Sequence, residues 1–127
     1  RLEVYVQRTG ETGARPLEGA EVHPGDVLQW VVSLREARWV AIVGSDSAGV
    51  ASVYFPRADI AATNATWVAA VTDVRLDASL TLDDTLGRET IVALFCVEAP
   101  TTIGIDAVAA GCESQRIELT KTARPGR

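Results

Sequence analysis

Few residues in this chain could do chemistry, and the first of them is its single histidine, His23. A Ser-His-Asp or Cys-His arrangement would need this histidine as its base. His23 begins the segment His-Pro-Gly-Asp, whose residue types form turns, and a turn histidine is usually solvated. We therefore predict no catalytic residue, and a hydrolase that uses His23 is only a remote alternative.

The two cysteines, Cys96 and Cys112, are a second source of chemistry. Cys96 lies in the apolar run 91–97, which lacks the cationic surroundings that activate a catalytic thiolate. The pair forms no CxxC motif, and no second pair completes a zinc site. An even count fits one disulfide, but two free thiols are equally ordinary. If the disulfide forms, closing the loop would contribute roughly 3 kcal/mol of stability.

Three carboxylates, Asp83, Asp84 and Glu89, surround one turn and could supply hard oxygen ligands to calcium. Their spacing lacks the alternating ligands of an EF-hand, and Arg88 offsets part of the charge. Solvated turn carboxylates are the expected outcome, so we predict no metal site. Segment 46–49 lacks the lysine of a P-loop, and no GxGxxG motif is present, so no cofactor is predicted.

The aromatic residues could line a carbohydrate or peptide groove. Trp30 and Trp39 fall in patterns that already require core residues, so packing is their expected role. Tyr5 and Trp67 lie outside those apolar faces and are better surface candidates. The possible ligand or partner surface comprises Tyr5, Trp67, Asp83, Asp84 and Glu89.

Composition limits the class of protein. The 127 residues fit one domain, and a hydrophobic fraction of 47% suffices for one core. The net charge of −5 argues against the basic surface that nucleic-acid binding requires. No apolar run approaches the roughly 20 residues of a membrane span. Because methionine is absent, we expect an excised part of a larger protein, with any membrane anchor outside this chain.

We expect β-strands to hold these residues in place, because the strongest pattern in the chain is the alternation of apolar and polar side chains, which is typical of strands. Apolar and polar side chains alternate over 2–7, 27–34 and 73–83. The last run is long for a strand, so we expect a break at 77–79. Two continuously apolar runs, 39–43 and 91–97, predict central strands covered on both faces.

Turn residues separate these runs. Segment 45–49 predicts a hairpin between 39–45 and 50–55. Pro100, a capping threonine and Gly111 predict a short helix at 102–110. The remaining expectations are a loop or short helix with a return strand at 58–70 and a closing strand at 114–120.

The predicted fold is mainly β, a β-sandwich of seven or eight strands with the one short helix. An immunoglobulin-like order is one candidate, and a barrel is the alternative. We expect a single domain over 1–121 and a frayed tail at 122–127.

Four segments within residues 22–121 together resemble a bacterial domain family of unknown function: VHPGDVLQWVVSL, VAIVGSDSAGVASVYFP, LTLDDTLGRETIVALFC and GCESQRIELTK. The shared signatures are a Pro-Gly-Asp turn, a Tyr-Phe-Pro strand end and a Leu-Asp-Asp-x-x-Gly-x-Glu turn. The signature positions here are Pro24, Gly25, Asp26, Asp46, Gly49, Tyr54, Pro56, Asp83, Asp84, Gly87 and Glu89.

In that family the domain is appended to caspase-like peptidases or to membrane-anchored anti-sigma-like proteins, especially in myxobacteria. The resemblance implies an accessory or sensing module whose signature positions include no catalytic residue. The Cys96 and Cys112 positions also match, which favours an extracytoplasmic or periplasmic location, although a cytoplasmic one stays open.

The expected function is a non-enzymatic recognition or sensory module of a bacterial envelope or signalling protein. Its partner would be a protein, a peptide or an envelope ligand. The alternative is a structural or self-associating accessory domain. The first strand, 2–8, is the expected edge for pairing with a partner strand.

Overall fold

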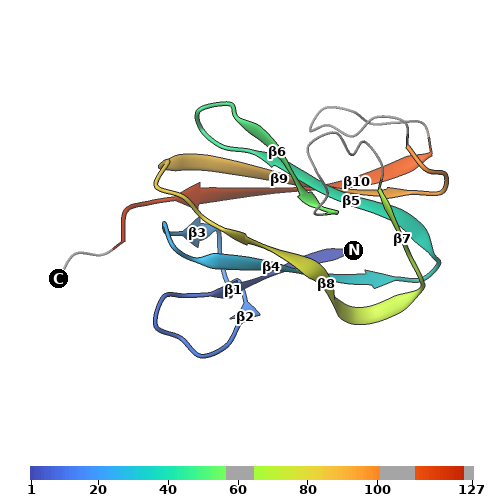
Figure 1. Ribbon diagram of the computed structural model, residues 1–127, viewed down its shortest axis with the longest axis horizontal. Helices are drawn as coiled ribbons and strands as arrows, with labels where there is room; N and C mark the ends of the chain where they lie inside the picture. Colours follow the sequence, from blue (N-terminus) through green and yellow to red (C-terminus); the bar gives the residue numbers. More distant parts are fainter. Residues whose placement is uncertain (57–64, 101–110, 125–127) are drawn as a thin grey trace.

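The structure, a computed structural model, describes residues 1–56, 65–100 and 111–124. These residues form ten strands in two facing sheets and no helix, and hence none that could cross a membrane (Figure 1). The helix predicted at 102–110 lies outside the described residues. The strands are β1 (Leu2–Gln7), β2 (Arg15–Pro16), β3 (Glu21–Val22), β4 (Val27–Leu34), β5 (Arg38–Ser45), β6 (Ala51–Phe55), β7 (Thr66–Val68), β8 (Val71–Thr81), β9 (Gly87–Cys96) and β10 (Cys112–Lys121).

The fold is a β-sandwich, and six of its ten described strands share the order of strands in an immunoglobulin-type sandwich. One sheet runs β2-β1-β4-β8, and the other runs β3-β10-β9-β5-β6, with β7 also paired to β5. The strands β1, β4 and β8 take the places of strands A, B and E, and β5, β9 and β10 those of C, F and G. The predicted β-sandwich is confirmed. It has more strands than expected because β2 and β3 are only two residues long, too short for a periodic signal.

Several strands coincide with the sequence pattern. The strand β4 has the predicted bounds, and β5 and β6 form the predicted hairpin. Asp46 closes its turn, because its Oδ1 accepts the backbone N–H groups of Ala48 (2.9 Å) and Val50 (3.0 Å). The expected return strand is β7, the expected closing strand is β10, and 58–64 lie outside the described residues.

The long alternating run 73–83 forms a single strand, β8, so the predicted break is wrong. Its pairing with β4 instead shifts: Gln29 faces Ser79, but Val31 faces Arg75. The extra residues form a bulge at the place where the break was expected. A bulge bends a strand and keeps the hydrogen-bonded ladder on either side, a distinction that periodicity alone does not reveal.

The main core lies between the sheets, where Trp30 of β4 is fully buried and stacks on Tyr54 of β6 with ring centroids 5.8 Å apart. A second apolar cluster lies on the outer face of the six-stranded sheet. Successive residues of β5 alternate between the two, with Val40 and Ile42 in the main core and Ala41 and Val43 in the outer cluster. The prediction that β5 and β9 are covered on both faces is confirmed.

The first strand is not a free edge, and that prediction is wrong. The strand β1 lies between β2 and β4, and the Leu17 N–H donates to the Val4 carbonyl (2.9 Å). At the start of β1, the Gln115 side chain accepts the Leu2 N–H and donates to the Leu2 carbonyl, both at 2.8 Å. A glutamine from the opposite sheet thus takes the place of a neighbouring strand and ties the two sheets together.

Candidate functional site

The end of the sandwich where β4 passes into β5 lies on the right in Figure 1. A groove of about 960 Å³ is formed by residues at this end. This is the volume range of small-molecule and peptide pockets. The groove is lined by Arg1, Ser33, Leu34, Arg35, Glu36, Arg38, Ala70, Val71, Thr72, Phe95 and Glu113.

The groove has an apolar floor and a charged rim. Its floor contains Leu34, Val71 and Phe95, which pack on or within the main core. On the rim, Arg38 donates to the Ala37 carbonyl and to the Glu36 carboxylate, both at 2.9 Å. These two contacts fix the Arg38 guanidinium at the wall of the groove.

Three further charged side chains lie on the rim. One of them, Arg35, is exposed and forms no ion pair within the described ranges. The side chains of Arg1 and Glu113 complete the rim.

Two local features hold the groove in shape. Ser33 of β4 accepts the Asp73 N–H at its Oγ (2.9 Å) and donates to the Asp73 carboxylate (3.2 Å), which fixes β8 beside the β4–β5 turn. The second feature is a disulfide between Cys96 and Cys112, which face each other on β9 and β10 with Cα atoms 4.0 Å apart. The possible disulfide is therefore present, and it directly adjoins the floor residue Phe95.

At the opposite end of the sandwich, the acidic turn does not form an open ligand surface. Lys121, with a side-chain exposure of 0%, places its Nζ 2.6 Å from both Asp83 Oδ1 and Glu89 Oε1. Glu89 is buried, so its prediction as a surface residue is wrong; Asp84 remains exposed. The lysine occupies the position between the carboxylates that a cation would take. No group of three or more metal-ligating side chains occurs in the described part of the chain.

Lys121 and the carboxylates around it shift one another's pKa values. Burial acts to lower the pKa of Lys121, but the hydrogen bonds to Asp83 and Glu89 together with the charges of these two residues outweigh it and raise the pKa above its ordinary value. The hydrogen bond from Lys121 in turn lowers the pKa of Asp83. Nearby, burial first and then the charges of Glu89, Asp46 and Asp83 raise the pKa of Tyr54 to about 12.

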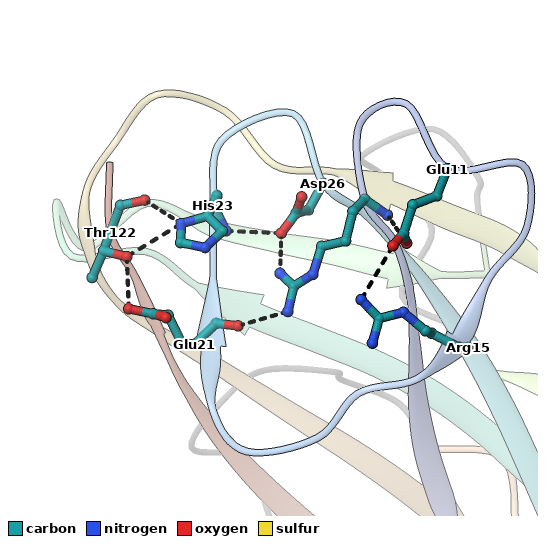
Figure 2. A network of polar contacts seen from close by, with 7 residues as sticks. Glu11, Arg15, Glu21, His23, Asp26 and Thr122 are labelled. Carbon is teal, nitrogen blue, oxygen red and sulfur yellow. Dashed lines mark hydrogen bonds and ion pairs between the residues drawn. The ribbon is translucent and has the colours of Figure 1, made fainter. Parts of the chain in front are cut away.

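His23 belongs to a polar network that anchors the chain (Figure 2). The buried carboxylate of Asp26 accepts the His23 N–H (2.9 Å) and pairs with the Arg8 guanidinium. The imidazole Nδ1 lies 3.0 Å from the Thr122 carbonyl, which can only accept, so Nδ1 carries the proton in this contact. The tail predicted at 122–127 is therefore attached at its first residue, where Thr122 also donates its N–H to Val22 (3.0 Å).

The remaining predicted surface residues do not converge. Tyr5 points outward from the four-stranded sheet, because Val4 and Val6 on either side of it enter the core. Trp67 is 52% exposed on the outer face of the other sheet, 5.3 Å from Trp39 between ring centroids. Trp39, predicted to be core, is only partly buried. The two surface candidates thus lie on opposite faces.

The groove was not predicted from the sequence. The one pattern that could have indicated it is the charged turn 35–38 between two apolar strands, because binding residues concentrate on loops held by rigid elements. No protein-family model, curated protein or solved structure matches the chain.

Proposed function

We propose that this domain is a non-catalytic recognition module of a larger bacterial envelope or signalling protein, and that it binds an acidic peptide segment of a partner in the groove. The observation that carries this proposal is the arrangement of Arg1, Arg35 and Arg38 around an apolar floor. Three arginines face two glutamates at this rim, whereas the whole chain has a net charge of −5. The positive character is therefore local to the groove.

Arginine suits a carboxylate ligand because its planar guanidinium donates two parallel hydrogen bonds. Arg38 is already oriented by Glu36 and the Ala37 carbonyl, so little side-chain entropy is lost on binding. The floor residues Leu34 and Phe95 offer a site for one apolar side chain between two acidic ones. An acidic peptide with an interspersed apolar residue fits both features.

Calorimetric titration with a synthetic peptide of alternating Asp and Phe residues tests this proposal. We expect binding that weakens as salt is added, because exposed charges are screened within about 10 Å at 0.1 M salt. The double variant Arg35→Glu/Arg38→Glu should weaken it at least about tenfold. The matched control Arg88→Glu changes an exposed charge at the far end of β9 and should leave it unchanged.

A control peptide with Asn in place of Asp separates charge recognition from apolar contact. Equal binding of the two peptides, or equal effects of the groove and control variants, would refute the assignment of the groove. An oxidising compartment is part of the same proposal, supported by the Cys96–Cys112 disulfide, since such bonds persist mainly outside the cytosol.

A second candidate function, self-association, is favoured by one observation. The strand β6 ends the six-stranded sheet, its sequence Ala-Ser-Val-Tyr-Phe carries no charge, and Val50 and Val53 beside and within it are exposed. The edge strand β8, in contrast, carries Asp73, Arg75 and Asp77, the kind of protection that blocks edge pairing. Sedimentation at rising concentration should show a dimer that Val53→Lys abolishes, and a monomer throughout would exclude this function.

A further inference from the structure

Lys121, at the end of β10, is the one lysine of the chain, and its side chain is completely buried. Its register partner Val22 is fully buried, and Leu82, next to its ion-pair partner Asp83, is buried as well. Lysine is almost never buried in such surroundings unless it is paired. Here its Nζ lies 2.6 Å from oxygens of both Asp83 and Glu89, so one buried amine contacts a buried carboxyl group and a carboxyl group at the surface.

We propose that Lys121 and Asp83 form an intramolecular amide crosslink, with Glu89 as the proton carrier. In this step Nζ of Lys121 attacks Cγ of Asp83, one C–N bond forms and one C–O bond breaks. An ammonium and a carboxylate become an amide and one water molecule. The charge balances, and neither an oxidant nor a reductant is needed.

The contacts around Asp83 suit this attack. Its Oδ1 lies at hydrogen-bond distance from Nζ, so Cγ is only one covalent bond further away. The backbone N–H of Thr85 donates to the same oxygen (3.0 Å), where negative charge develops when the amine adds to the carboxyl carbon. The Asp83 side chain is 65% exposed, which gives the departing water a path to solvent.

Glu89 is placed to move the protons. Its side chain is 7% exposed and its Oε1 lies 2.6 Å from Nζ. It can accept a proton from the attacking amine and return it to the oxygen that leaves Asp83, which is general acid–base catalysis. Because the site holds two carboxyl groups for one amine, a carboxylate remains for this role while the other reacts.

The surroundings favour the product. Condensation removes the charge of Lys121, whose side chain is completely buried, and burial disfavours an ion. Reacting groups held in contact reach effective molarities of about 10⁵–10⁸ M. The contacts that the Lys121 ammonium donates to the two carboxylates favour its protonated form, so we expect a slow reaction that accumulates only in the folded chain.

Mass spectrometry of the whole chain tests the proposal. After a week folded at neutral pH, followed by denaturation and reduction, the mass should fall by that of one water molecule. Trypsin should then release a branched peptide that joins the segment containing Asp83 to the one containing Lys121. A sample kept unfolded in urea for the same time should retain its full mass.

Variants assign the roles. Lys121→Arg should abolish the branched peptide, Asp83→Asn should form the same bond with loss of ammonia, and Glu89→Gln should slow the reaction by about 10²-fold or more. The control Glu118→Gln, in an exposed ion pair with Arg116, should leave the rate unchanged. The mass of the unaltered chain tests the proposal even if a variant fails to fold. Full mass after a week, or water loss confined to a linear peptide, would overturn the proposal.

Discussion

The carboxylate of Asp26 should be one of the most important single side chains for the stability of this domain. It is 1% exposed, and its Oδ2 receives both the His23 N–H and the Arg8 guanidinium. Its backbone is also engaged, since the Leu82 N–H donates to the Asp26 carbonyl (2.9 Å). The substitution Asp26→Ala removes the side-chain contacts and leaves the backbone bond in place, so it isolates the carboxylate.

The expected loss follows from what each partner can do afterwards. The His23 N–H is left without its acceptor, which costs about 1–3 kcal/mol. Arg8 loses its counter-charge, but its side chain is 25% exposed and it still donates to the Glu21 carbonyl (3.3 Å). Its penalty therefore falls well below the roughly 3–5 kcal/mol of a fully buried broken pair. Together we expect a loss of about 2–4 kcal/mol in the free energy of unfolding.

Urea denaturation followed by tryptophan fluorescence measures this loss, because Trp30 is fully buried in the core. Asp26→Asn keeps an oxygen that can accept the His23 N–H and should cost only about 1–2 kcal/mol. The control Glu11→Gln weakens the exposed ion pair with Arg15 and should cost clearly less than Asp26→Ala. If Asp26→Ala is no more destabilising than Glu11→Gln, the buried carboxylate does not organise this end of the domain.

Three further predictions concern the interior. Spectrophotometric titration should show one of the two tyrosines, Tyr54, ionising near pH 12, and Tyr54→Phe should remove that late component; because the folded pKa lies above the unfolded value of 10.0, this group makes stability fall as the pH rises from 10 to 12. Gly44→Ala should lower stability by about 1–3 kcal/mol in thermal melts, because the new Cβ would lie 2.6 Å from the Thr90 carbonyl oxygen, which cannot move without the strand. Replacing Cys96 and Cys112 together by alanine should lower stability by about 3 kcal/mol, and alkylation of the native unreduced protein should label neither cysteine.

The sequence predicted the strands well where one physical signal dominated. Alternation placed β4, and continuous apolarity placed β5 and β9, because both patterns report directly which faces of a strand are buried. The hairpin between β5 and β6 followed from a turn that Asp46 closes with its own side chain. These features are local, so the sequence contains them in full.

The edges and the site depend on contacts between distant residues and could not be read in this way. The free edge expected at 2–8 is closed by Gln115, which is 113 positions away from Leu2. No local pattern around Lys121 predicts its burial, and only the fold reveals that it contacts two carboxylates. The groove is likewise assembled from turns of both sheets and the start of the chain.

The two ends of the sandwich use charge in opposite ways, and this difference decides where recognition is best placed. At the β9 start, charged groups contact one another inside the protein: Arg8 pairs with Asp26, and Lys121 with Asp83 and Glu89. Groups that already satisfy each other can bind a ligand only by breaking those contacts, at a cost of several kcal/mol. At the groove end, Arg35 is exposed and forms no ion pair within the described residues, so a carboxylate can bind to it without such a loss, although Arg38 beside it already contacts Glu36. The paired charges at the β9 start therefore stabilise the fold, and the charged turn between β4 and β5 is the better candidate for contacting a partner.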